Sequence, residues 1–212
     1  MQNRNKIMTF LEFKDKMFAL GCFNIHQIYA WKHDFDRNNL TRWVKKGYLV
    51  RLRQGHFAFS EYRGKNDYAM YFANRIYRPS YISLHTALAF YGMIPEMVVQ
   101  ITSVTSLKTA SFTNNFGEYS YRNIKESLMF GYDLKPIVDN RTMQFATPEK
   151  ALLDLLYLYT FYNTEQEMEA LRLDEDYLHN YLKKDLLKDN LSVFRSKTLE
   201  QRIKLLFKTY QL

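Results

Sequence analysis

Six Lys or Arg residues and no Asp or Glu lie in the segment from Arg37 to His56, RNNLTRWVKKGYLVRLRQGH. Lys and Arg bind the phosphates of nucleic acids, and Asn and Arg also pair with base edges. The chemistry that this segment predicts is recognition of a polyanion, with duplex DNA as the first interpretation. We expect nine of its residues at the DNA surface: Asn38, Thr41, Arg42, Lys45, Lys46, Arg51, Arg53, Gln54 and His56.

A short helix is needed to position the first of these residues. The apolar and small residues of the segment recur at the spacing of one helical face: Leu40, Trp43, Val44 and Gly47. The polar residues then project from the opposite face, as in a recognition helix, and Asp36 is expected to cap the helix. Asn38 and Arg42 are the best suited to base edges, because Asn matches adenine and Arg matches guanine in two-point contacts.

After Gly47 the pattern changes to that of a hairpin. Apolar residues alternate with a period of two, from Tyr48 through Val50 and Leu52, and a Gln54-Gly55 turn follows. Arg51 and Arg53 then share a strand face, where they would hold phosphate or enter the minor groove together with Lys46 and Gln54. Helices expected at 8–20 and 24–31 come first. This order predicts a winged helix-turn-helix over residues 1–62.

The charge is concentrated in the same part of the chain. Residues 1–62 carry 11 basic and 5 acidic side chains, whereas residues 63–212 carry 19 and 17. A charge run is often only a solvated surface, but this asymmetry favours a polyanion-binding module joined to a nearly neutral one.

Cys22 is the only cysteine, which excludes a disulfide framework and a thiolate zinc cluster. No run approaches the roughly 18 to 20 apolar residues of a membrane span, and the first ten residues lack the apolar core of a signal peptide. We therefore expect a cytoplasmic protein.

Residues 63–212 are expected to form an α+β domain with a mostly antiparallel sheet and a helical tail from about 165. The expected helices are 68–77, 83–92 with Ser83 as cap, 147–161, 165–171, 175–188 and 198–210. The expected strands are 80–82, 98–104, 129–134 and 143–146, with a hairpin around Asn114–Gly117. The apolar residues of the tail are expected to fill the core rather than form a dimer interface: Leu178, Tyr181, Leu182, Ile203, Leu206 and Phe207.

Two segments of this second domain resemble a known family. SYISL at 80–84, continued by ALAFYGMIP at 87–95, and ATPEKALLDL at 146–155 resemble the AbiEi family of transcriptional regulators, antitoxins of type IV abortive-infection toxin-antitoxin systems. The winged helix ahead of them, with GYLVRL at 47–52 and GHFA at 55–58, is similar to that family's N-terminal domain. The resemblance covers about residues 8–162. It implies a repressor of its own operon that reads inverted repeats, and an antitoxin that counters a nucleotidyltransferase toxin without a stable complex. A stand-alone regulator is the alternative.

Enzymatic chemistry is a weaker interpretation, and we expect no cofactor. The five histidines lack the paired spacing of a metal site, and there is no P-loop or Gly-x-Ser-x-Gly elbow. His85 could face a cleft, although a half-buried structural histidine is the simpler interpretation. A nuclease-like second domain would need clustered carboxylates around a metal beside a lysine. The candidates are Glu118, Asp133, Asp139 and Glu149 with Lys150, of which the last two begin a helix whose capping explains them. A protein-interaction adaptor without DNA would leave the basic excess unexplained.

Overall fold

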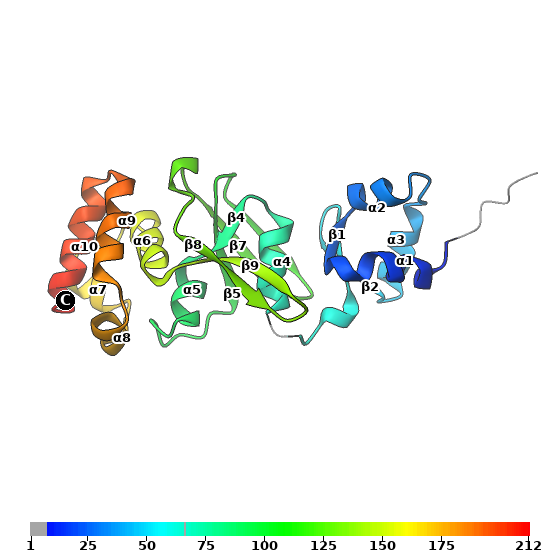
Figure 1. The fold of residues 1–212 in the computed structure, drawn as a ribbon. Coiled ribbons are helices and arrows are strands. Elements are labelled where there is room, and N and C mark those ends of the chain that lie inside the picture. The colour runs from blue at the N-terminus through cyan, green and yellow to red at the C-terminus, as the bar shows by residue number, and fades with distance from the viewer. Residues whose placement is uncertain (1–7, 66) are drawn as a thin grey trace, which may run out of the picture. The chain divides into compact units, whose positions relative to one another are not determined.

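The computed structural model describes residues 8–65 and 67–212, which form two compact units. The first unit holds the described residues up to Tyr68 together with Thr113–Phe116. The second holds Ala69–Phe112 and Gly117–Leu212. Figure 1 labels most of their helices and strands.

Three α-helices and a three-stranded antiparallel sheet make up the first unit. Its elements are α1 (Phe10–Met17), η1 (Phe18–Leu20), β1 (Cys22–Asn24), α2 (Ile25–Trp31), α3 (Asn38–Lys45), β2 (Leu49–Arg53), β3 (His56–Phe59) and η2 (Ser60–Tyr62). The sheet order is β1-β3-β2. The predicted helices at 8–20 and 24–31 are confirmed, and both begin with capping boxes, from Thr9 to Glu12 and from Asn24 to Gln27. Strand β1 was not predicted, because three residues are too few to show a period.

The second unit is built on a six-stranded sheet of order β6-β7-β5-β4-β9-β8. Its strands are β4 (Ser80–Ile82), β5 (Gln100–Thr105), β6 (Ala110–Asn114), β7 (Gly117–Asn123), β8 (Tyr132–Ile137) and β9 (Arg141–Ala146). The pairs β4/β5 and β8/β9 are antiparallel, and the two-residue loop between β6 and β7 makes that pair antiparallel as well. The pairs β5/β7 and β4/β9 are parallel. The predicted, mostly antiparallel α+β architecture is confirmed within the described residues.

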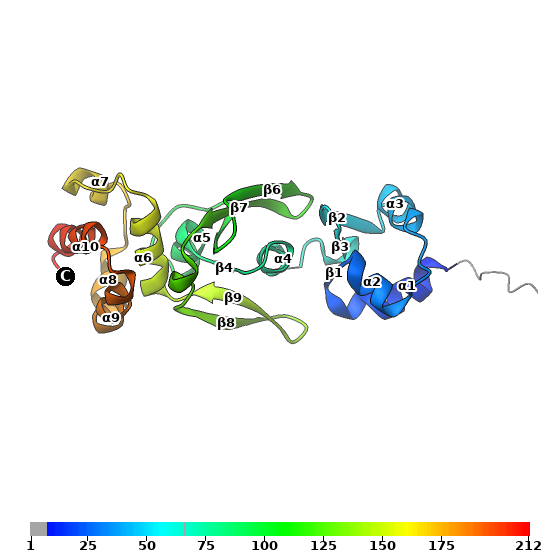
Figure 2. The same cartoon turned by 90° about the horizontal axis from the view of Figure 1, so that it is seen from above.

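Helices make up the rest of this unit. They are α4 (Tyr68–Ile76), α5 (Leu84–Phe90), α6 (Pro148–Leu158), α7 (Glu165–Glu169), α8 (Glu175–Asn180), α9 (Lys184–Phe194) and α10 (Lys197–Thr209), with a 3₁₀ turn η3 (Glu126–Leu128). Figure 2 shows α4 between the hairpins β6-β7 and β8-β9. The Tyr121 hydroxyl on β7 donates to the Ala73 carbonyl, and Asn74 accepts the Gln144 amide of β9, so α4 is bonded to both hairpins. Helix α6 packs on α5, and α9 and α10 pack on α6.

Several predicted boundaries in this unit are wrong. Strand β8 begins at Tyr132 rather than 129, because η3 and the turn at Gly131 (φ 68°) precede it. The predicted helix 175–188 is two helices, since the Glu149 carboxylate accepts the Lys183 amide at the start of α9. Helix α6 ends at Leu158 instead of about 161. Tyr181, expected in the core, is 65% exposed.

Apart from Tyr181 and the half-buried Phe207, the predicted tail residues belong to the core of the second unit. The tail's buried apolar residues include Leu178, Leu182, Leu187, Leu199, Ile203 and Leu206. The Arg202 guanidinium donates to the carbonyls of Leu156 and Thr160 at the end of α6 and to the Asn163 side chain, each at 3.0 Å. A cation at a helix C-terminus satisfies carbonyls that lack a helical partner. One side chain therefore fixes α10 to α6.

Candidate nucleic-acid interface

Helix α3 presents four of the predicted DNA-contacting residues on one exposed face. Asn38, Thr41, Arg42 and Lys45 are exposed, and their spacing of three, four and seven residues places them on one side of the helix. Leu40 and Trp43 are buried on the other side. This division of the helix between core and solvent is the one that the sequence predicts.

An aromatic core fixes the rotation of α3. The Trp43 ring lies 4.7 Å from the Phe13 ring and 5.4 Å from the Phe10 ring, both on α1, and 6.0 Å from Phe35. Aromatic contacts of this kind add to the free energy that burial itself supplies. Because Trp43 packs against these three aromatic rings, the opposite face of α3 is exposed to solvent.

The N-terminus of α3 is capped by Asp36, as predicted. Its carboxylate accepts the Asn38 amide at 2.9 Å, although the residue directly before the helix is Arg37. A carboxylate at this end also interacts favourably with the helix dipole. Asp36 therefore acts on the N-terminus of the helix, ahead of the basic residues of the exposed face.

Arg42 has an intramolecular partner that the sequence did not reveal. Its guanidinium donates to the carboxamide oxygen of Asn39, which is 5% exposed. The only sequence signal was an Asn three residues before an Arg on a helix. A guanidinium carries five N–H donors, so one bond orients the side chain and leaves other donors for a ligand.

The hairpin β2-β3 continues the basic surface. Arg51 pairs with Phe57 and Arg53 pairs with His56, with a register irregularity between the two arginines. Arg51 and Gln54 are exposed, whereas Arg53 is half-buried. Gly55 adopts a φ of 76° in the turn, which favours glycine. The predicted hairpin and its turn are confirmed.

Tyr48 departs from the predicted alternation. It lies just before β2, is 42% exposed and has the Lys46 ammonium 5.9 Å from its ring centre. Leu49, which pairs with Phe59, occupies the buried position instead. Lys46 and Tyr48 together extend the exposed surface between α3 and the hairpin.

His56 is half-buried at the start of β3. Its Nδ1 lies 3.3 Å from the Gln54 carbonyl oxygen. Burial lowers the pKa of His56 below its ordinary value of 6.5, and the positive charge of Arg53 lowers it further, while the hydrogen bond to the Gln54 carbonyl opposes this shift. His56 is therefore neutral at pH 7, and it can offer a hydrogen bond but no charge to a phosphate.

Besides Asp36, two acidic residues that flank the basic segment pair with lysines outside it. Asp34 binds Lys32 at 3.0 Å, and Glu61 binds Lys14 at 2.6 Å. No acidic residue occurs in residues 37–60. The nine predicted residues thus form a basic surface, made of the exposed face of α3 and the hairpin β2-β3.

The second unit contains a closed cluster of buried polar groups. Lys150 and Asp154 form an ion pair with fully buried side chains, and the Lys150 ammonium also donates to the Tyr81 hydroxyl at 2.8 Å. The hydroxyls of Tyr81 and Ser83 donate to one Asp154 oxygen at 2.8 Å each. Burial raises the pKa of Asp154 and of Tyr81. Every polar atom of the cluster has a partner inside it, which is the arrangement of a structural network.

This cluster corrects two sequence predictions. Ser83 stands at the N-cap position of α5, but its hydroxyl makes no capping bond because Asp154 accepts it. Lys150 was explained by its place at a helix start, whereas its side chain is needed as the partner of Asp154. Lys150 and Asp154 are four residues apart on α6, but the sequence does not show that Tyr81 on β4 and Ser83 before α5 join them.

The carboxylates considered for a nuclease site do not come together. Glu118 and Asp133 are exposed on different strands, Asp139 binds Arg141 at 3.4 Å, and Glu149 accepts the Lys183 amide at 3.0 Å. Among residues 8–65 and 67–212 the structure has no group of three His, Cys, Asp or Glu that could hold a metal ion. His85 is half-buried, lies edge-on to Tyr159 with ring centres 5.4 Å apart, and lines a cavity of about 430 Å³.

Comparisons with known proteins give no match: no protein-family model matches the chain, and no curated protein matches it either. No helix in the described part of the chain is long and apolar enough to cross a membrane.

Proposed function

We propose that this protein is a DNA-binding transcriptional regulator whose first unit is a winged helix-turn-helix. The observation that carries the proposal is the basic surface, in which an exposed polar helix face adjoins a basic hairpin with no acidic residue between positions 37 and 60. The element order α1, β1, α2, α3, β2, β3 with a β1-β3-β2 sheet supplies both parts that such a domain uses.

The two parts of the surface have different roles in this proposal. Helix α3 enters the major groove, where Asn38 and Arg42 read base edges. Thr41 and Lys45 contact neighbouring groups of the DNA in the same groove. Lys46, Arg51, Arg53 and Gln54 contact phosphates, and neutral His56 adds a hydrogen bond. Asn39 orients the Arg42 guanidinium from within the protein.

The resemblance of the second unit to AbiEi regulators supports a more specific role. We propose an autorepressor and antitoxin of a type IV pair, with a nucleotidyltransferase as the functional partner. The two resembling segments, 80–95 and 146–155, are joined through the buried network of Tyr81, Ser83, Lys150 and Asp154. Co-expression with a nucleotidyltransferase encoded beside the gene tests this role. If this protein does not relieve the growth arrest that the nucleotidyltransferase causes, the alternative of a stand-alone regulator is favoured.

The test of DNA binding compares two duplexes of equal length across a salt series. One contains the DNA upstream of the protein's own gene, and the other has the same composition in scrambled order. Tighter binding to the first, with a steep loss of affinity on adding salt, is the expected result. Equal, weak binding to both would contradict the proposal.

Two arginine variants separate base reading from phosphate contact. Arg42→Ala should weaken the binding free energy for the cognate duplex by about 1–3 kcal/mol and relax specificity at one base position. Arg53→Ala should weaken the cognate and scrambled duplexes alike. An equal loss on both duplexes for Arg42→Ala would show that Arg42 does not read a base.

A further inference from the structure

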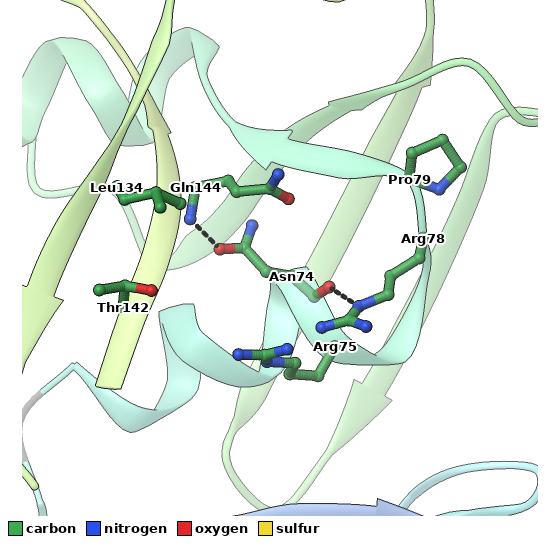
Figure 3. Close-up of a pocket in the computed structure, with 7 residues that line it drawn as sticks. All are labelled: Asn74, Arg75, Arg78, Pro79, Leu134, Thr142 and Gln144. Atoms are coloured by element: carbon green, nitrogen blue, oxygen red, sulfur yellow. Dashed lines mark hydrogen bonds between the residues drawn. The ribbon is translucent and has the colours of Figure 1, made fainter. Parts of the chain in front are cut away.

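The second unit contains a cavity of about 360 Å³ between helix α4 and hairpin β8-β9 (Figure 3). Its lining comes from α4, the connection after it and both strands: Asn74, Arg75, Arg78, Pro79, Leu134, Thr142 and Gln144. None of these seven lining residues is acidic. Small-molecule sites occupy about 300–1,000 Å³, so the cavity is large enough for a ligand.

Asn74 places a buried hydrogen-bond donor in this cavity. The residue is 4% exposed, and its carboxamide oxygen accepts the Gln144 backbone amide at 2.6 Å. That bond fixes which end of the carboxamide faces β9, as Figure 3 shows. The amide nitrogen is left buried and without a hydrogen-bond partner.

Arg75 adds a second buried donor of the same kind. Its Nε is buried and has no hydrogen-bond partner, and its guanidinium lies 4.8 Å from the Tyr71 ring centre. Each buried polar group without a partner costs about 1–3 kcal/mol. Two such donors in one cavity therefore favour binding of a hydrogen-bond acceptor there.

Arg78 supplies a second positive charge at the same cavity. Its Nε donates to the Asn74 carbonyl at 3.3 Å, and its side chain lines the cavity together with that of Arg75 (Figure 3). Two guanidinium groups and an amide donor, without a carboxylate, match an anion with several oxygens. Arginine is well suited to phosphate because its planar fork makes paired hydrogen bonds.

We propose that this cavity binds a phosphate group, either free or attached to a small molecule. The amide of Asn74 and the guanidinium groups of Arg75 and Arg78 donate to the phosphate oxygens. The exposed Pro79 and Leu134 side chains offer apolar surface to an attached organic group. This site lies within the second unit and is independent of the proposed DNA-binding surface.

Isothermal titration of the full chain tests the site with three probes: inorganic phosphate, adenosine monophosphate and adenosine. We expect saturable binding of the first two and none of adenosine. Tighter binding of the monophosphate would assign the site to phosphorylated small molecules, and equal affinities would assign it to free phosphate. Absence of saturable binding for both phosphate probes would overturn the proposal.

Variants then locate the binding. Arg78→Ala, at an exposed position, should weaken phosphate binding by about tenfold or more. Asn74→Asp keeps the acceptor for the Gln144 amide but replaces the donor by a carboxylate, so binding should be lost. Lys204→Ala removes one charge from an exposed position on α10 and should bind as the unmodified chain does.

These variants also separate the site from the basic surface of the first unit. Phosphate binding that survives Arg78→Ala and Asn74→Asp but is lost in Arg42→Ala would overturn the proposal. Thermal unfolding of each variant checks its fold. If Asn74→Asp fails to fold, the exposed Arg78→Ala variant decides the outcome alone.

Discussion

Lys150 and Asp154 each supply the charge that the other needs, because the side chains of both are fully buried. Removing a charged group from water costs several kcal/mol, and the pair offsets this cost only while both members and their hydrogen bonds are present. Tyr81 and Ser83 complete the bonding of the Asp154 carboxylate. At the scale of single residues, the bonds of this pair are directed to each other and to Tyr81 and Ser83, as in a structural network.

Asp154→Asn should therefore lower the free energy of unfolding by about 3–5 kcal/mol, because it leaves the Lys150 ammonium buried without a counter-charge. Chemical denaturation measures the loss. The double variant Lys150→Met/Asp154→Asn removes both charges and should lose less than the single variant. A double variant that is less stable than Asp154→Asn would contradict this account of the pair.

His56 gives a pH dependence with a defined sign. Burial lowers its pKa in the folded protein below the ordinary 6.5, so the unfolded chain takes up a proton more readily. The stability that neutral His56 contributes is fully present above about pH 6.5. It is lost as the pH falls through the pKa that His56 has in the folded protein. NMR titration of its ring should give a midpoint below 6.5, and His56→Gln should reduce the loss of stability on acidification. A midpoint at or above 6.5 would contradict the effect of burial.

At the scale of elements, the sequence predicts structure best where local patterns decide it. The helical spacing of Leu40 and Trp43 and the Gln54-Gly55 turn predict α3 and the hairpin correctly, along with the exposure of the residues on the face of α3. The misses occur mostly where distant residues decide. Ser83 binds Asp154, and Glu149 accepts the Lys183 amide where one helix ends and the next begins. Such contacts leave no periodic signal.

The anchoring of the C-terminal helix is another contact of this kind. Arg202 on α10 is buried and donates to the Leu156 carbonyl in the last turn of α6 and to the Thr160 carbonyl and the Asn163 side chain just after it. Arg202→Met keeps part of the apolar stem but leaves these acceptors without their donor. We expect a loss of about 3 kcal/mol in the free energy of unfolding.

Lys204→Met is the matched control for this prediction. Lys204 lies on the same helix but is exposed, so its replacement should change the stability by less than about 0.5 kcal/mol. Equal stability changes for the two variants, measured by denaturant unfolding, would show that Arg202 does not fix α10 to α6.

At the scale of the whole molecule, two explanations of DNA affinity compete. The net charge is +8, and a polyanion could be attracted by this total wherever the charges lie. Alternatively, affinity depends on the basic surface, made of the exposed face of α3 and the hairpin β2-β3, where residues 37–60 contain no Asp or Glu. The first explanation makes all exposed lysines equivalent, and the second does not.

Lys45→Glu and Lys204→Glu distinguish the two explanations. Both lysines are exposed on helices, and both changes lower the net charge by the same amount, but only Lys45 lies on the α3 face. We expect Lys45→Glu to weaken binding to the upstream duplex and to reduce the slope of log affinity against log salt by about 0.9 for each lost phosphate contact. Lys204→Glu should leave that slope unchanged. Equal effects of both substitutions would mean that total charge, and not the α3 face, determines binding.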